Sequence, residues 1–195
     1  MTRGIACFAA CLIGVAMAPA AAADSPKSPY AGQQTRSIKS LSAEDITELR
    51  NGGGWGLAKA AELNGVPGPA HLLELGDAIG LTADQRQAVE AIRAAMKIAA
   101  IRQGRQLIDL EAVLDRRFKN KTITERELAT LLTDIAMTRR DLRLTHLSAH
   151  LKTASVVTEA QVAIYNRLRG YASDPCDAVP AGHDPALWRK HNDCR

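Results

Sequence analysis

The sequence predicts an all-α protein, an elongated helical hairpin or cradle of four to five helices. Only 4% of the 195 residues are aromatic, whereas β-sandwiches and barrels favour aromatic and β-branched side chains. Alanine and leucine are abundant, and both lose little conformational freedom on entering a helix. Apolar residues recur at spacings of three and four over long segments, which is the helical period.

Residues 1–23 have the pattern of a cleavable export signal. Arg3 is their single charge, an apolar run follows, and small alanines precede the expected cleavage point. The run is shorter than the ~20 apolar residues that span a membrane. A lipoprotein signal is the alternative, but Cys7 and Cys11 come too early for it. The mature, exported chain is therefore expected to begin near Asp24.

The mature chain is expected to start with an extended arm, which short helices follow. Residues 24–40 are rich in Pro, Ser and Gln. Ser42 begins a helix, with Asp45 in a near-capping box, and the glycines of 52–56 end it. This stretch lacks the Gly-Lys-Ser/Thr of a phosphate loop, so we interpret it as a hinge. Two further helices are expected, over 57–63 and 70–79.

Two long helices are predicted to form the hairpin. Thr82 caps the first, whose apolar stripe continues to Phe118, with a bend expected at Gly104. Unbroken, it would be about 55 Å long, more than the ~40 Å diameter of a compact globule of this size. Thr124 and Glu127 form a capping box at the start of the second.

The second long helix carries two nearly opposite apolar stripes. One of them consists of Met137, Leu144, Leu147 and Leu151. A helix that is apolar on both sides needs a partner on each side. One partner is the preceding helix, and the other is the N-terminal helices, a second subunit or a bound client.

A signature of the form apolar-Thr-x-x-Gln opens two helices. In each copy the Thr hydroxyl accepts from the backbone at the third helical position, and the Gln side chain reaches back to the cap. Such a box alone indicates only that a helix starts, but two of them framing an exported hairpin are more specific. The signature residues are Leu81, Thr82, Gln85, Val157, Thr158 and Gln161.

Through LTADQ (81–85), VTEAQ (157–161) and the closing YNRLRGY (165–171), the chain resembles the LTxxQ family of periplasmic proteins. This family includes Spy/CpxP-type refolding chaperones and related heavy-metal sensor and resistance proteins. Residues 28–46 and 56–75 look like an Ala-rich branch of it, and Val157 departs from the motif's Leu.

The resemblance implies a periplasmic all-helical domain over residues 41–171, often an antiparallel homodimer. It would hold unfolded or misfolded envelope proteins without nucleotide, and a membrane-anchored sensor is a further implied partner. In the chaperone members the concave face mixes basic and apolar side chains. By this resemblance, the client-contacting residues would be Arg86, Arg93, Met96, Arg139, Arg140 and Arg143; the alternative is that the arginines are plain surface and Met96 is core.

His146 and His150 support an alternative function, a metal sensor or metal-binding resistance protein. At positions i and i+4 they share one side of a helix and could both reach a metal ion, with His71 joining from another helix. Zinc, copper, nickel or cobalt would be the ion, whereas the chaperone function requires no cofactor. No carboxylate or methionine is obviously placed to complete the shell, and a packed, hydrogen-bonded His146 is the ordinary alternative.

Two cysteines remain after signal removal, Cys176 and Cys194 in the 172–195 tail. In an oxidising compartment they predict one disulfide, worth ~3 kcal/mol through the loop it closes. A zinc site that adds His183 and His191 is the rival interpretation.

The sequence supports neither nucleic-acid binding nor catalysis. The net charge is +4, and the Arg116-Arg117 and Arg139-Arg140 pairs are interleaved with acidic residues, as on a solvated helix face. No nucleophile elbow is present, and no nucleophile, base and electrophile set can be assembled. We therefore expect a protein that is not an enzyme.

Overall fold

The computed structural model describes residues 27–173, 175–192 and 194, and it confirms the all-α prediction for them. Helices dominate, and no β-strand occurs in these ranges. The chain divides after Gly32 into two units, each considered by itself. The expected signal sequence lies outside the described residues, and the described part of the expected arm includes a short 3-10 helix, Gln33–Thr35.

The α-helices of the second unit are α1 (Ala43–Arg50), α2 (Lys59–Glu62), α3 (Pro69–Glu74), α4 (Gly76–Ile79), α5 (Ala83–Lys119), α6 (Glu125–Ala154), α7 (Glu159–Leu168) and α8 (Pro185–His191).

The structure has more helices than the expected four to five, because one expected short helix is split in two and the tail contains a helix that was not expected. The helix expected over 70–79 is split at Leu75 into α3 and α4. Helix α8 lies in the tail, where no helix was expected; the Asp184 carboxylate caps it, and Pro185 supplies its first residue.

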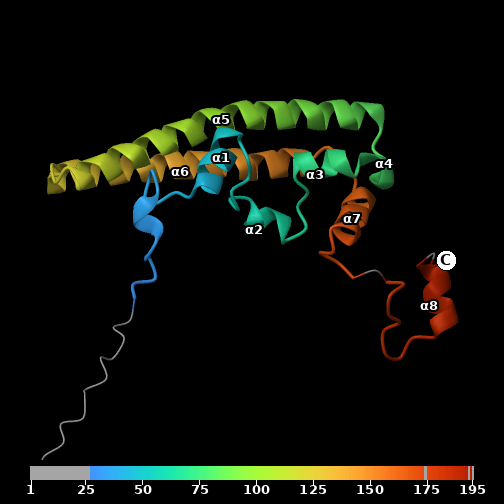
Figure 1. The fold of residues 1–195 in the computed structure, drawn as a ribbon. Coiled ribbons are helices and arrows are strands. Elements are labelled where there is room, and N and C mark those ends of the chain that lie inside the picture. Colours follow the sequence, from blue (N-terminus) through green and yellow to red (C-terminus); the bar gives the residue numbers. More distant parts are fainter. Residues whose placement is uncertain (1–26, 174, 193, 195) are drawn as a thin grey trace, which may run out of the picture. The chain divides into compact units, whose positions relative to one another are not determined.

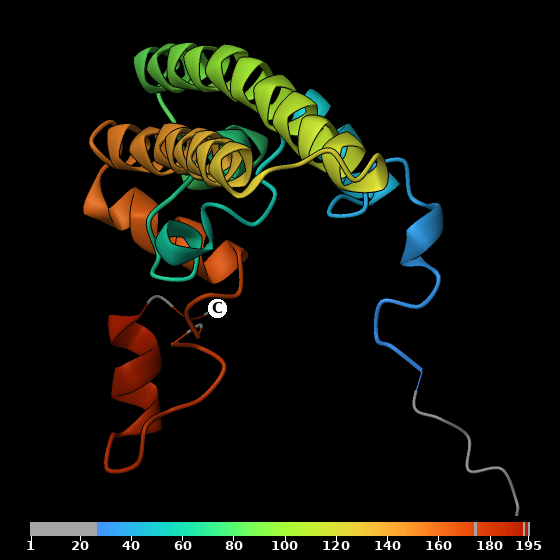
Figure 2. The ribbon, with the colours of Figure 1, turned by 90° about the vertical axis from the view of Figure 1, so that its left-hand side faces the viewer.

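Helices α5 and α6 form the predicted hairpin and lie side by side along most of their length (Figures 1 and 2). The Thr124–Glu127 capping box starts α6 as expected. The turn between the helices places Lys121 in the left-handed region at φ +54°. Phe118, expected in the core stripe, is instead 55% exposed, because it lies in the last turn of α5 at the hairpin tip.

Two clusters of buried apolar side chains form the core of the described chain. The first joins α1 to the middle of the hairpin, and the second joins α3 and α4 to α5 and α7. Buried members of the first are Ile38, Leu41, Leu49, Ala100, Leu107, Ile108, Ile135 and Leu142. Those of the second are Leu72, Ile79, Val89 and Tyr165.

Gly104 lies within the unbroken helix α5, and the close approach of α1 requires a glycine there. A Cβ atom at this position would overlap the carbonyl oxygen of Leu49, the buried residue of α1. The backbones of the two helices are therefore in direct contact at this crossing.

The two predicted signatures form capping boxes and also bond to each other. The Gln85 Nε2 donates to Gln161 Oε1 and the Gln161 Nε2 donates to Gln85 Oε1, each at 2.9 Å. Each carboxamide also accepts from the backbone N–H of its own capping threonine, Thr82 or Thr158. The second amide hydrogens go to the Val156 and Gly80 carbonyls respectively, each at 3.0 Å.

This arrangement, the glutamine pair of Gln85 and Gln161, uses the full hydrogen-bonding capacity of both carboxamides. The Val156 and Gly80 carbonyls each lie two residues before the capping threonine of the opposite signature. The pair therefore joins the start of α5 to the start of α7, across the open end of the hairpin.

Replacing Gln85 with Ala should destabilise the protein more than an ordinary capping-box loss. It removes one cap and three hydrogen bonds to the α7 segment, at a cost of about 2–3 kcal/mol. Glu127→Ala is the matched control, because its carboxylate completes a capping box on α6 and bonds only to Thr124 besides a 3.8 Å ion pair with Arg117. It should destabilise the protein less than Gln85→Ala does, because only a cap is lost. Urea unfolding measures both, and equal losses would contradict a cross-linking role for the pair.

Gly104→Ala should destabilise the fold, although helix propensity alone predicts a stabilisation of about 1 kcal/mol. The added methyl overlaps the Leu49 carbonyl, and relieving such overpacking typically costs about 1–3 kcal/mol. Gly54→Ala is the control, since its Cβ would meet no atom within 4 Å. Thermal unfolding would contradict the close-approach argument if Gly104→Ala melted at or above the wild-type temperature.

Candidate functional site

A cavity of about 310 Å³ lies between the glycine loop after α1 (residues 51–54), the start of α3, and the helices α5 and α6. Both histidines of the expected pair line it, together with His71, Arg93 and Met96. The structure therefore brings five of the sequence-predicted residues to one place. We name this space the histidine cavity.

The ring of His150 is buried and fixed by a backbone carbonyl. Its Nδ1 lies 2.8 Å from the carbonyl oxygen of Val66, which can only accept a hydrogen bond. Nδ1 is therefore the protonated nitrogen, and in the neutral ring Nε2 carries the lone pair. Gly68 packs against the same ring, and a Cβ there would be 2.7 Å from Nε2.

His146 lies one helical turn earlier on α6. It is 4% exposed, and its Nε2 is buried with no hydrogen-bond partner in the described structure. The Gly53 backbone lies close enough to the ring to act on its pKa. Burial lowers the pKa of His146, and charge on His150 lowers it further, against the Glu48 carboxylate and the Gly53 carbonyl. Burial therefore favours the neutral form of the His146 ring.

Glu62 of α2 adds a carboxylate to the cavity, which sequence reasoning did not find. Its Oε2 is 3.9 Å from His150 Nε2. Its Oε1 accepts from Tyr165, Tyr171 and Arg169 at 3.1, 3.0 and 2.9 Å. This side chain comes from a four-residue helix more than 80 positions before the histidines, so no spacing pattern connects them.

Hydrogen bonding keeps Glu62 ionised despite its partial burial. Burial by itself raises the pKa of this carboxyl, but hydrogen bonds from Tyr171 and Tyr165, together with positive charge at His71 and Arg169, lower it overall. Burial and the Glu62 charge in turn raise the pKa of the Tyr165 hydroxyl, which stays a donor.

Met96 and Glu62 supply the two ligand types that the sequence did not obviously place beside the histidines. As they stand, however, no three His, Cys, Asp or Glu side chains of the described chain are grouped closely enough to hold a metal ion. His71 is at the cavity wall, where its Nδ1 pairs with Glu74 at 2.8 Å and its side chain is 40% exposed. A cation would therefore require the cavity side chains to close around it.

Three of the other client-contacting candidates form ion pairs. Arg86 pairs with Asp77, and Arg140 pairs with Asp141. Arg139 is 3.7 Å from the buried Glu111 carboxylate and lies over the Trp55 ring. Arg143 is exposed on α6.

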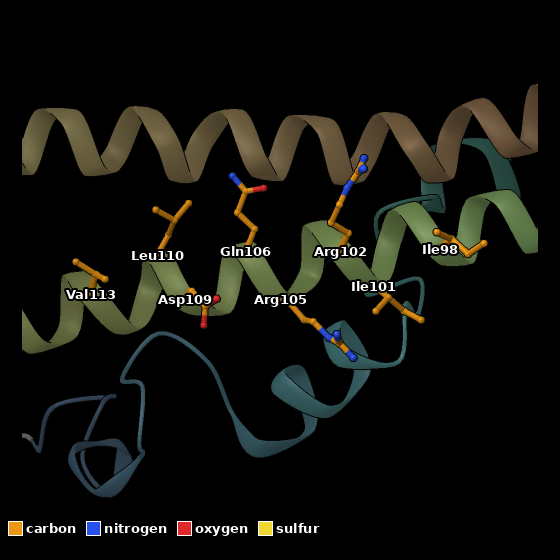
Figure 3. Close-up of a pocket in the computed structure, with 8 residues that line it drawn as sticks. All are labelled: Ile98, Ile101, Arg102, Arg105, Gln106, Asp109, Leu110 and Val113. Atoms are coloured by element: carbon orange, nitrogen blue, oxygen red, sulfur yellow. The ribbon is translucent and has the colours of Figure 1, made fainter.

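A different mixed apolar and basic surface lies on α5. It is an open groove of about 610 Å³. Figure 3 shows that the Arg102 and Arg105 side chains leave the helix on opposite sides. Ile98 is 74% exposed, and neither arginine forms an ion pair with a described residue. We name this surface the α5 groove; its lining residues are Ile98, Ile101, Arg102, Arg105, Gln106, Asp109, Leu110 and Val113.

The second apolar stripe of α6 is largely uncovered. Met137, Leu144 and Leu151 are 50%, 51% and 67% exposed, whereas Leu147 is half-buried. The N-terminal helices therefore do not cover these three side chains.

The two tail cysteines are bonded to each other, as expected. Cys176 and Cys194 form a disulfide with a Cα–Cα distance of 5.4 Å. His183 packs edge-on against Trp188, whose indole N–H donates to the Pro175 carbonyl. The rival zinc site needs both sulfurs as free thiolates, so this pairing excludes it in the disulfide form.

No family model matches this chain, and neither the curated proteins nor the solved structures contain a match. Among the described helices, none combines the length and apolarity needed to cross a membrane.

Proposed function

We propose that this protein is a periplasmic, nucleotide-independent chaperone of the LTxxQ type that binds unfolded or misfolded envelope proteins. The α5 groove is the observation that carries the proposal. Unfolded chains expose apolar side chains together with charge, and the groove offers exposed Ile98 beside the unpaired cations of Arg102 and Arg105. Neither a nucleotide nor a catalytic residue is needed for such binding.

The uncovered stripe of α6 gives the proposal further support. Met137, Leu144 and Leu151 recur every seven residues, so they lie along one side of the helix. Apolar side chains in a continuous row are typical of surfaces that meet another chain. The stripe is consistent with the antiparallel homodimer that the family resemblance implies.

The purified protein should suppress aggregation of a denatured model protein at a near-stoichiometric ratio. The double variant Ile98→Asp/Arg105→Glu places negative charge in the α5 groove and should weaken this protection about tenfold, because it removes an apolar contact and reverses a cation. Light scattering provides the measurement.

Leu187→Asp is the matched control, because Leu187 is 57% exposed on α8 and lies outside the groove. It should protect as the wild type does. Lack of suppression by the wild type at tenfold excess would refute the chaperone proposal, and equal protection by all variants would refute the role of the groove.

We propose metal binding, in a sensor or resistance protein, as the second candidate function. The histidine cavity favours it, because two buried imidazoles lie one helical turn apart, and His150 donates its Nδ1–H to the Val66 carbonyl and leaves Nε2 available. Metal-ligating histidines characteristically have this second hydrogen bond, which fixes the ring and its tautomer.

Calorimetry with zinc, copper, nickel and cobalt should detect binding that the His146→Ala/His150→Ala double variant loses. His183→Ala/His191→Ala is the control, since it removes the same number of imidazoles from the tail. Circular dichroism checks that both variants are folded. Unchanged binding in the cavity variant would rule out this site.

A further inference from the structure

Positive charge is concentrated where α5 turns into α6. Residues 116–127, which we name the basic tip, carry five lysines and arginines but only two glutamates. Figure 1 shows α3 and α4 beside the opposite end of the hairpin, away from this turn. All five cations of the basic tip are exposed: Arg116, Arg117, Lys119, Lys121 and Arg126.

Two of the nearby carboxylates are engaged by other groups. Glu127 lies 3.8 Å from Arg117 and closes the capping box of α6. Asp115, directly before the basic tip, pairs with Lys39 at 3.6 Å. Three cations of the basic tip have no ion-pair partner in the described chain; they are Arg116, Lys119 and Lys121.

The carbonyl groups at the end of α5 are bonded by the backbone of the turn rather than by these cations. The Lys121 N–H donates to the Phe118 carbonyl at 3.0 Å, and the Thr122 N–H donates to the Arg117 carbonyl at 3.1 Å. This pair of bonds is the Schellman motif, which satisfies the last carbonyls of a helix. The cationic groups are therefore free to meet a partner outside the chain.

Lys121 occupies the position of this motif at which glycine is favoured. Its φ is +54°, in the left-handed region that disfavours a residue with a Cβ atom. A lysine here costs stability relative to glycine, and no ion pair with a described residue offsets that cost. An unfavourable backbone conformation of this kind points to a role of the side chain outside the fold.

An aromatic ring lies among the cations. Phe118 is the only phenylalanine of the described chain, and it is 55% exposed. An exposed apolar ring flanked by lysines and arginines is typical of segments that lie on an anionic bilayer, where the ring enters the acyl boundary and the cations meet lipid phosphates. The expected export signal favours a membrane over nucleic acid, because an exported protein is separated from the nucleic acids of the cell.

We propose that the basic tip binds the surface of an anionic membrane, with Phe118 in the interface and the unpaired cations on the lipid phosphates. The inference is independent of both candidate functions, because the basic tip lines neither the α5 groove nor the histidine cavity. Attachment is peripheral and reversible, since one ring and a few cations bind a bilayer only weakly. It holds the hairpin by one end and leaves the α5 groove accessible.

Sedimentation of the mature, exported chain with lipid vesicles tests the proposal. The protein should bind vesicles that contain phosphatidylglycerol but not vesicles of phosphatidylcholine alone, and added salt should weaken the binding. The triple variant Arg116→Gln/Lys119→Gln/Lys121→Gln should lose about a hundredfold in affinity, because each cation near an anionic surface contributes about fivefold. Phe118→Ala should lose about fivefold or more.

Lys121→Gly separates membrane binding from folding. It removes the left-handed strain, so the melting temperature should stay the same or rise, whereas vesicle affinity should fall about fivefold. Arg167→Ala is the matched control, because it removes one exposed cation from α7 instead. Its vesicle affinity should equal that of the wild type.

Three results would overturn the proposal. The first is equal binding to the two kinds of vesicle, and the second is unchanged affinity of the triple variant. The third is binding of a DNA duplex through the same residues, as tight as binding to the phosphatidylglycerol vesicles, since it would assign the basic tip to nucleic acid instead.

Discussion

The reciprocal amide pair between Gln85 and Gln161 is the contact on which the rest of the fold depends. Helices α5 and α6 are joined covalently only at the hairpin tip, and the pair joins the chain again at the opposite end. It fixes the first turn of α7 against the first turn of α5. Tyr165, one turn further along α7, then enters the second core cluster, and its hydroxyl reaches Glu62. The glutamine pair thus positions Tyr165, and Tyr165 in turn holds Glu62, which lines the histidine cavity.

Backbone contacts shape the cavity as much as side chains do. Gly53 and Gly68 lie where a Cβ would collide, with Glu48 in the first case and with the His150 ring in the second. The Val66 carbonyl orients the His150 imidazole. This ring is therefore held in one orientation, with Nδ1 as its donor.

Local patterns in the sequence predicted the local parts of the fold. The capping boxes at Thr82, Thr124 and Thr158 each begin a helix, and the stripe spacing predicted the α5–α6 hairpin. These features depend on residues three or four positions apart. The same reasoning predicted the glutamines as caps but not as a pair, because their mutual contact joins positions 76 apart.

In the candidate site, too, local spacing predicted one feature, whereas contacts between distant positions could not be predicted. The spacing of His146 and His150 predicted that both face one side of a helix, which the structure confirms. Glu62 could not be predicted, since it comes from a short helix whose position is set by tertiary packing. The partners of the arginines could not be predicted for a related reason: sequence gives the charge of each side chain, whereas its acidic partner, such as Asp77 for Arg86, depends on the fold.

The double attachment of the hairpin has a consequence for how this architecture can vary. With one end closed by the turn at Asn120 and the other by the glutamine pair, a change in the length of one long helix must be balanced by an equal change in the other. Adding a heptad to α5 alone would pull Gln85 about 10 Å out of register with Gln161. Adding heptads to both helices would leave both ends closed. Such a scaffold can lengthen or shorten the middle of the hairpin, which carries the α5 groove, while the glutamine pair stays the same.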